Sequence, residues 1–418
     1  MSANPKQARE DHFERDMAQY RADFPALVQE VNGHPLAFLD SAASSQRAQP
    51  VIDAVTHYET HDHANVHRGV HTLSQRATES YEGARESVQR FINGASTREV
   101  VFTRGTTESI NLVAQCFAGP RLSAGDEVLI THLEHHANIV PWQMLCERTG
   151  AKLIVAHVED DGSVPAENVT SRFTDRTRIL AISAVSNALG TVLPLDEIIP
   201  AAKAADITVV VDGAQAVPHQ QVDVQALGAD FFAFSAHKMV GPTGIGVLWG
   251  RETLLDAMPP WQGGGDMIET VTLEKSTWNT LPYKFEAGTP NISGAVGLGA
   301  AVEYLQGVGM DNISRYEHLL LNVLTEQLEA QGDVRIVGTA PGKAAVVSFL
   351  MDGVHPHDLG TIVDHHGVAV RTGHHCAMPI MQRFDVPGTA RASLAFYNNR
   401  DDIDALVASL ATVRKLFK

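Results

Sequence analysis

The sequence predicts an α/β fold built on a mostly parallel β-sheet that is covered by helices. Between Glu99 and Gly250, seven short apolar runs, most of them β-branched, alternate with helical stretches, which is typical of a parallel sheet. The chain has 418 residues, 44% hydrophobic and 19% charged, so it is long enough to bury a large core. After about residue 296 the pattern changes to long helices followed by separate strands. These observations predict a large α/β domain followed by a smaller α+β domain.

The expected strands of the sheet follow one another between residues 99 and 250. They are EVVFT, DEVLI, KLIVAHV, TRILAIS, ITVVVD, DFFAFS and GVLWG. After the first of them, apolar residues recur at helical spacing from Ile110 to Phe117. We therefore expect a helix that begins just after Thr107 and stops at Gly119-Pro120.

The second half of the chain divides into loops, helices and a second group of strands. A glycine-rich loop at 262–265 and a loop marked by Gly and Pro through 288–290 close the sheet region, and 300–331 is largely helical with a break at 307–310. Strands at VRIVGT, AAVVSFLM, GVAVRTG and ARASLAFY then precede a final helix. We expect an N-terminal arm over 1–25, helical or partly disordered, a large domain over 26–295 and a small domain over 296–418.

Charge and cysteine content limit the classes of partner and compartment. The 32 Lys and Arg against 49 Asp and Glu give a net charge of −17, which disfavours nucleic acid as a partner. Three cysteines in a long chain are a poor disulfide framework and favour a reducing, cytoplasmic setting. The N-terminus lacks the apolar region of a signal peptide, and no run is long enough to span a membrane.

Polar residues follow several of the expected strands, where open α/β sheets bind their ligands. They are Gly105-Thr106-Thr107, His132 to His136, Asn187, Asp212 to Gln215, and Ser235 to Lys238. A cap or a turn explains any one of these groups. Together they predict a binding site at this edge of the sheet.

Asp212 and Lys238 are the most informative members of this set. Each emerges from an apolar strand, so each is expected to be desolvated. For Asp212 alone a structural salt bridge is the commoner explanation, whereas a desolvated lysine has a depressed pKa and attacks carbonyl groups. With the hydroxyl-rich helix start, the pair indicates pyridoxal phosphate. Lys238 would bond its aldehyde and Asp212 would hold its ring nitrogen protonated. Thr106, Thr107, Ser235 and His237 would bind its phosphate.

The motifs extend this interpretation along nearly the whole chain. FLDSAASSQ, NVHRGVHTLS, RGTTESINLVA, THLEHHANIVPW, SAVSNALGT, VDGAQA, SAHKMVGPTGIGVLWG, FEAGTPNI, RTGHHCAMP and RASLAFYNN resemble the class V, fold-type I pyridoxal-phosphate enzymes, and within them the SufS-type, group II cysteine desulfurases. The resemblance implies that His135 stacks on the cofactor ring and that Gln215 contacts its phenolate oxygen. It also implies a homodimer in which Thr289 of the second subunit contacts the phosphate. Departures from the family pattern, Ser109 and a long N-terminal tail, do not involve the chemistry.

Cys376 decides which reaction is expected. It lies in Arg-Thr-Gly-His-His-Cys-Ala-Met-Pro, with two histidines before it and Arg371 nearby, a setting that favours thiolate. A single cysteine is otherwise most often an inert, buried hydrophobe, and we interpret Cys116 and Cys146 in that way. The resemblance makes Cys376 the residue that receives sulfur.

Five residues, Arg371 among them, are candidates for substrate binding, and metal is not expected. Arg391 would bind the substrate carboxylate through its planar guanidinium, with Asn187 assisting, although an internal ion pair is the alternative. His67 and Arg68 resemble an active-site segment of the family. The 20 histidines include adjacent pairs, but their spacings match no strong zinc pattern.

The expected reaction is conversion of L-cysteine to L-alanine with a persulfide left on Cys376. The resemblance further implies a sulfur-acceptor protein of the SufE or SufU type and a role in iron–sulfur cluster assembly. Three alternatives stay open: a selenocysteine lyase, a class V aminotransferase, which would have no use for Cys376, and a non-catalytic sulfur-carrier scaffold.

Overall fold

A seven-stranded sheet forms the centre of the molecule, and it confirms the seven strands expected from the sequence. The computed structural model describes residues 5–417. The strands are β4 (Val100–Thr103), β5 (Glu127–Thr131), β6 (Lys152–Ala156), β7 (Thr177–Ser183), β8 (Thr208–Asp212), β9 (Phe231–Ser235) and β10 (Gly246–Gly250). Their order is β4-β10-β9-β8-β7-β5-β6, and only β10 runs against its neighbours. The sheet is therefore mostly parallel, as predicted.

Alternation along the strands divides the core into two layers. In β8, Val209 and Val211 belong to one buried cluster and Val210 to the other, because successive side chains point to opposite faces. The connecting segments include α4 (Thr106–Leu112), η5 (Val113–Ala118), α5 (Val140–Thr149), α6 (Ala166–Thr170), α7 (Leu195–Ala204), α8 (Val224–Leu227) and α9 (Glu252–Asp256). Helix α4 begins at Thr106, so the expectation that it starts after Thr107 is wrong by two residues. Gly105 (φ +150°) supplies the backbone turn that permits the earlier start.

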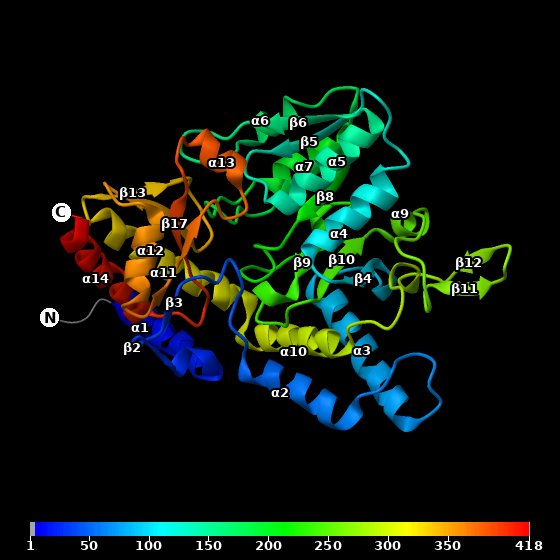
Figure 1. Ribbon diagram of the computed structural model, residues 1–418, viewed down its shortest axis with the longest axis horizontal. Helices are drawn as coiled ribbons and strands as arrows, with labels where there is room; N and C mark the ends of the chain where they lie inside the picture. The colour runs from blue at the N-terminus through cyan, green and yellow to red at the C-terminus, as the bar shows by residue number, and fades with distance from the viewer. Residues whose placement is uncertain (1–4, 418) are drawn as a thin grey trace.

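Three long helices lie together along one side of the sheet (Figure 1). They are α2 (Gln49–His57), α3 (Thr72–Phe91) and α10 (Ile292–Val308), with η3 (Tyr58–Asp62) between the first two. Helices α10 and α3 pack closely, since a Cβ on Gly299 would lie 3.0 Å from that of Ala84. The expected break at 307–310 is confirmed: α10 ends at Val308, and α11 (Met310–Glu329) begins after Gly309. Residue 296 falls inside α10, and the domain boundary proposed there stays a prediction.

A second, antiparallel sheet lies at the other end of the molecule. Its order is β13-β14-β17-β16, formed by β13 (Val334–Val337), β14 (Val346–Met351), β16 (Arg371–Gly373) and β17 (Thr389–Ser393). Helices α12 (Pro356–Asp364), α13 (Met378–Arg383) and α14 (Arg400–Phe417) accompany it. The single strand expected at GVAVRTG is two short strands, β15 (Val368–Ala369) and β16. The strand expected at ARASLAFY is β17, with Arg391 in its middle.

The N-terminal segment packs against this second sheet region. Strand β3 (Ala37–Phe38) pairs in parallel with β15, and the first described helix lies at the same end of the molecule as α14 (Figure 1). Before β3 come α1 (Pro5–Ala18), η1 (Gln19–Asp23), η2 (Pro25–Val28), β1 (Glu30–Val31) and β2 (His34–Pro35). The expected N-terminal arm is thus helical from Pro5, and its residues 1–4 lie outside the described residues.

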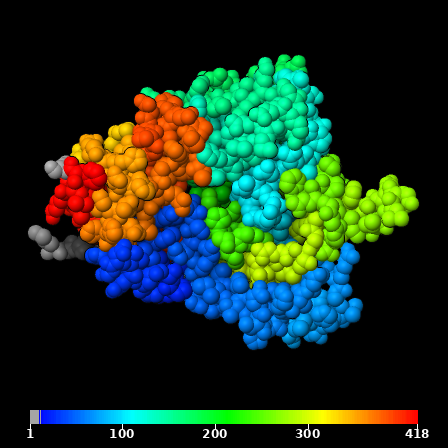
Figure 2. Space-filling view, in the orientation of Figure 1, coloured from blue at the N-terminus to red at the C-terminus, as the bar shows by residue number. Residues whose placement is uncertain are grey.

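Smaller elements complete the fold. A hairpin of β11 (Ile268–Val271) and β12 (Ser276–Trp278) projects from the body of the molecule, with Leu273 fully exposed at its turn (Figure 2). Short turns of helix occur at η4 (Thr97–Glu99), η6 (His136–Asn138), η7 (Ala236–Lys238) and η8 (Tyr283–Phe285). Within residues 5–417, the helices are all too short or too polar to cross a bilayer.

Candidate active site

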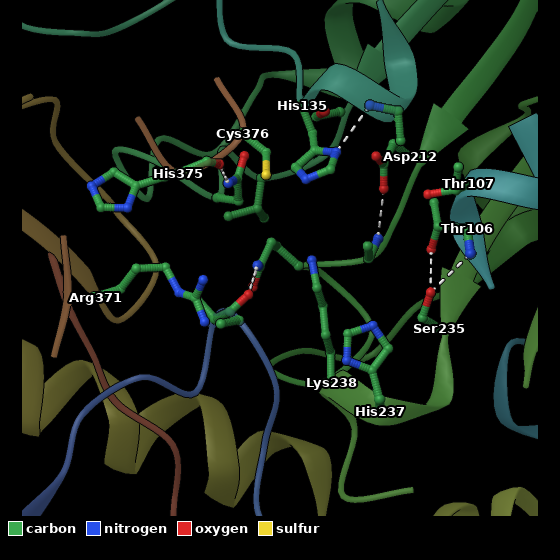
Figure 3. Close-up of a pocket in the computed structure, with 18 of the residues that line it drawn as sticks. Thr106, Thr107, His135, Asp212, Ser235, His237, Lys238, Arg371, His375 and Cys376 are labelled. Carbon is green, nitrogen blue, oxygen red and sulfur yellow. Dashed lines mark hydrogen bonds between the residues drawn. The ribbon is translucent and has the colours of Figure 1, made fainter. Parts of the chain in front are cut away.

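A cavity of about 400 Å³ lies between the carboxyl ends of the large sheet and the edge of the small one. Twelve of the fifteen residues predicted for the site line it. They are Thr106, Thr107, His135, Asn187, Asp212, Gln215, Ser235, His237, Lys238, Arg371, Cys376 and Arg391. The large sheet contributes the ends of β4, β5, β7, β8 and β9, and the small sheet contributes β16, β17 and the loop before α13. Residues far apart in the sequence therefore share one chamber (Figure 3).

Asp212 ends β8, and Lys238 follows the neighbouring strand, β9. Lys238 is in η7, directly after β9, and its side chain extends into the cavity (Figure 3). Burial lowers the pKa of its amine to about 8, against the opposing effect of the Asp212 carboxylate. Asp212 is 5% exposed, accepts a 2.9 Å hydrogen bond from the Ala214 N–H, and has a pKa raised by burial. A buried carboxylate of this kind is stabilised by a cationic or donating partner in the cavity.

Hydroxyl groups gather where α4 begins. Ser235 Oγ accepts from the Thr106 N–H at 2.8 Å and lies 2.7 Å from Thr106 Oγ1. Thr107 and His237 also line the cavity. Burial lowers the pKa of His237 to about 4, so at neutral pH its ring is uncharged. Main-chain N–H and hydroxyl donors at a helix start suit a phosphate group.

His135 occupies the wall of the cavity nearest Cys376 (Figure 3). Its Nδ1 accepts a 3.0 Å hydrogen bond from the Ala137 N–H. Burial, together with the positive charge of Lys238, lowers the pKa of His135 to about 4, so the ring is neutral. In a neutral imidazole whose Nδ1 accepts, the proton is on Nε2. His135 therefore offers an Nε2–H donor to the chamber.

The polar lining fits pyridoxal phosphate. Gln215 Nε2 donates to the Ala42 carbonyl at 2.7 Å, while its Oε1 is buried without a partner among residues 5–417. An unsatisfied buried amide oxygen beside the cavity is what a polar ligand would complete. The amine of Lys238, the carboxylate of Asp212 and the hydroxyls near Thr106 are the groups that an aldehyde, a pyridine nitrogen and a phosphate require.

Cys376 and the residue before it both have a left-handed backbone conformation. His375 and Cys376 have φ values of +54° and +55°, a conformation uncommon outside glycine, which persists where the surroundings enforce it. The His136 N–H donates to the Cys376 carbonyl at 2.8 Å, and Asn187 Nδ2 donates to the His375 carbonyl at 2.6 Å. The Cys376 thiol is exposed, whereas Cys116 and Cys146 are buried. Burial raises the pKa of the Cys116 thiol to about 11, as expected for an inert cysteine.

Arg391 is buried beside the loop. Its Nη1 donates to the Asn187 carbonyl at 2.8 Å, and its Nη2 donates to Asp40 at 3.2 Å. Its Nε is buried without a partner within the part of the chain that the structure describes. Burial lowers its pKa to about 10, so at neutral pH the guanidinium stays charged. Arg391 therefore forms an ion pair with Asp40 and still has, among residues 5–417, an N–H donor free at Nε.

Asp40 and His375 are site residues that sequence reasoning missed. Asp40 forms an ion pair with Arg371 at 2.9 Å as well as with Arg391. It follows the apolar run Ala37 to Leu39, the same signal that identified Asp212. His375 lines the cavity and forms a 2.7 Å hydrogen bond with Thr389 Oγ1, and burial lowers its pKa to about 3.

Three predicted residues lie outside this cavity. Thr289 borders a separate hollow with Tyr81 and Phe102. His67 and Arg68 border another of about 280 Å³, where His67 contacts Glu82 at 2.8 Å and Arg68 contacts an aspartate at 3.1 Å. Within one chain, these three residues do not line the cavity that contains the other twelve predicted residues. Their roles stay predictions. Among residues 5–417, no group of three His, Cys, Asp or Glu side chains is arranged to hold a metal ion.

The chain matches known proteins along most of its length. Residues 37–406 match the family described as Aminotransferase class-V. A cysteine desulfurase of Salmonella agona (strain SL483) is 52% identical over 397 residues, which cover 95% of this chain and 98% of the relative. The crystal structure of the cysteine desulfurase CsdA from Escherichia coli, in an S-sulfonic acid form, superposes with a TM-score of 0.90 at 40% identity, covering 96% of this chain and 99% of that one.

An archaeal structure agrees with these matches. The apo structure of a cysteine desulfurase from Thermococcus onnurineus NA1 has a TM-score of 0.90 at 39% identity and covers 95% of this chain and 98% of that one. The predicted fold-type I architecture, enzyme class and cofactor are therefore confirmed. The chain belongs to the cysteine desulfurases of the pyridoxal-phosphate-dependent class V aminotransferase family.

Proposed function

We propose that this protein takes sulfur from L-cysteine, releases L-alanine and holds the sulfur as a persulfide on Cys376. The observation that carries the proposal is the position of Cys376. Its exposed thiol lines the same cavity as Lys238 and Asp212. Cys376 lies in the loop before α13, whereas Lys238 and Asp212 lie at the ends of strands of the large sheet. A class V aminotransferase without sulfur chemistry would have no use for this thiol.

Each part of the cavity has a partner on the cofactor in this proposal. Pyridoxal phosphate supplies an electron sink for the carbanion that forms at the substrate Cα. Asp212 would hold the ring nitrogen protonated, and Lys238 would bond the aldehyde. Gln215 would contact the phenolic oxygen, and His135 would stack on the ring. Thr106, Thr107, Ser235 and His237 would hold the phosphate.

Substrate binding and proton transfer follow from the charges of the lining. Arg391, with Asn187 beside it and Arg371 at the entrance, attracts the carboxylate of L-cysteine. Lys238 would accept the Cα proton on Nζ, because a pKa near 8 leaves a useful share of the amine neutral. His135 can then deliver a proton from Nε2, the nitrogen that its hydrogen bond to Ala137 leaves protonated.

The sulfur transfer balances without an added oxidant. The Cys376 thiolate attacks the substrate sulfur, so an S–S bond forms as the substrate Cβ–S bond breaks. The bonding pair of the Cβ–S bond stays on carbon, which gains a proton and becomes the methyl group of alanine. Cysteine and one thiol are thus converted to alanine and one persulfide.

The resemblance to SufS-type enzymes extends the proposal to partners. A persulfide on an exposed thiol can pass to another thiol, which supports a cytoplasmic acceptor protein of the SufE or SufU type and sulfur supply to iron–sulfur cluster assembly. Thr289 lies away from its own chain's cavity. This placement supports a homodimer in which Thr289 serves the phosphate site of the second subunit.

The test compares alanine formation by the wild type and by Cys376→Ala. Both proteins are loaded with pyridoxal phosphate and incubated with L-cysteine and a reducing thiol. We expect alanine from the wild type only, together with a sulfur adduct on Cys376 detected by mass spectrometry of the intact protein. Equal alanine from both proteins would refute Cys376 as the acceptor.

A further inference from the structure

A fully buried glutamate lies directly beside His135 and has no part in the proposed reaction. Glu134 is 0% exposed and does not line the cavity. Its Oε1 accepts a 2.7 Å hydrogen bond from the Thr131 hydroxyl, and its Oε2 accepts from Asn138 Nδ2 at 2.7 Å and from the Ser183 hydroxyl at 2.6 Å. One carboxylate thus ties together the ends of two neighbouring strands, β5 and β7, and the short helix η6.

The donor and acceptor roles in this network are fixed by one indole. Trp142 Nε1 donates to Asn138 Oδ1 at 2.9 Å, and an indole N–H can only donate. The other end of the Asn138 amide is therefore the NH₂ group, which must donate to Glu134. Burial raises the pKa of Glu134 to about 7, while the surrounding donors act in the opposite direction. The hydroxyls of Thr131 and Ser183 can donate or accept, so the obligatory contact is the one between Asn138 and Glu134.

The turn held by this network contains His135 and also contacts the loop that contains Cys376. Residues 131–138 place the His135 side chain in the cavity, with its Nδ1 fixed by the Ala137 N–H. The next residue, His136, holds the cysteine loop from two sides. Its N–H donates to the Cys376 carbonyl at 2.8 Å, and its Nε2 accepts from the Met378 N–H at 3.1 Å.

We infer that Glu134 is a positioning residue: through Asn138, Thr131 and Ser183 it holds the turn that orients His135 and anchors the Cys376 loop. The inference deepens the proposed function and rests on it for the identity of the reaction. Buried networks of this kind fix a geometry when every member is satisfied, and a misplacement of about 1 Å costs about 100-fold in rate. The left-handed backbone at Cys376 needs such external support.

The variant Asn138→Asp breaks the network with an almost isosteric change. It replaces the one obligatory donor by an acceptor, and the rates are measured at pH 9, above the pKa of about 7 of Glu134, to disfavour a proton shared between the two carboxyl groups. We expect kcat for alanine formation to fall about tenfold or more, with KM for L-cysteine changed by less than about twofold. This split is expected because Arg391 is held by Asp40 and the Asn187 carbonyl, outside the network.

Two further variants separate positioning from charge. Glu134→Gln keeps an oxygen toward Asn138 and offers its NH₂ group to the Thr131 hydroxyl, so we expect activity within about threefold of the wild type. Combining Glu134→Gln with Asn138→Asp exchanges donor and acceptor, and the pair is complementary again. The double variant should therefore recover most of the activity that Asn138→Asp loses. A tenfold loss in Glu134→Gln, or no recovery in the double variant, would overturn the inference.

Hydrogen exchange supplies a readout that does not depend on the reaction. In Asn138→Asp, the amide hydrogens of His136 and Met378 should exchange faster than in the wild type, because their acceptors move away. The same measurement on protein without cofactor distinguishes this inference from the proposed function: if the wild type makes no alanine, the exchange result still decides whether Glu134 holds the loop. Unchanged exchange at both amides would contradict the inference.

Glu99→Gln is the matched control. Glu99 is also buried, at 7% exposure, and accepts from the Ala95 N–H at 2.9 Å and from Trp249 Nε1 at 3.1 Å. It lies before β4, at the opposite end of that strand from Gly105, so its substitution should alter stability without altering kcat or exchange at the loop. If Asn138→Asp does not fold, Thr131→Val, which removes one hydroxyl from the network, should give a smaller shift of both readouts in the same direction. No shift in Thr131→Val would then refute the inference.

Discussion

If Lys238 bonds the cofactor as we propose, its ionisation sets the pH at which the protein takes up pyridoxal phosphate. The unprotonated amine attacks the aldehyde, and burial lowers the pKa of this amine from about 10.5 to about 8. The difference corresponds to about 3 kcal/mol in favour of the neutral form. At pH 7 about 9% of the amine is then neutral, against about 0.03% for an ordinary lysine, so loading should be about 300-fold faster than an unperturbed amine of equal reactivity would allow.

The assay follows the absorbance change when protein without cofactor is mixed with excess pyridoxal phosphate between pH 6 and 10. Because the folded-state pKa is lowered, the rate should rise about tenfold per pH unit below pH 8 and level off above it. A lysine model amide, titrated under the same conditions, corrects for ionisation of the cofactor itself. Asp212→Asn should move the midpoint to lower pH, since the Asp212 carboxylate opposes the shift. A rate that keeps rising toward pH 10.5 would refute the reasoning.

Three further predictions concern substrate, assembly and stability. Arg391→Lys keeps the charge but loses the planar fork, so KM for L-cysteine should rise about tenfold with a smaller change in kcat, and an unchanged KM would contradict the assigned role. Thr289→Val should form a dimer that loses the cofactor faster than the wild type on dialysis, with the dimer checked by sedimentation. A wild-type protein that sediments as a monomer and still retains the cofactor at full strength would exclude Thr289 from the phosphate site. Glu286→Gln should lower the free energy of unfolding by about 3 kcal/mol in urea, because Arg85, 1% exposed and 2.7 Å from Glu286, would keep only Glu82 as a charged partner; an unchanged urea midpoint would argue against the Arg85–Glu286 ion pair.

Local sequence signals predicted the sheet and most of the cavity. Strands such as β8 are runs of β-branched residues, and a parallel sheet places whatever follows them at one edge. For this reason Asp212 and Lys238, 26 residues apart, could be assigned to one site before their positions were known. The same reasoning applied to Thr106 and Ser235, which follow β4 and β9.

Contacts across the whole chain could not be predicted in this way. Asp40 reaches Arg371 and Arg391 because β3 pairs with β15, a contact between segments more than 300 residues apart for which no local pattern exists. Of the two contacts between His136 and the Cys376 loop, one is made by its main-chain N–H, which every residue type except proline has, and the other by its side chain across 242 residues of sequence. Thr289 belongs to a surface whose partner, in our proposal, is a second chain.

The central claim is that Cys376 receives the sulfur of L-cysteine, and alanine formation measured side by side in the wild type and Cys376→Ala tests it most directly. The account predicts alanine from the wild type, none above background from the variant, and cofactor bound equally by both. Equal rates of alanine formation from the two proteins would contradict it.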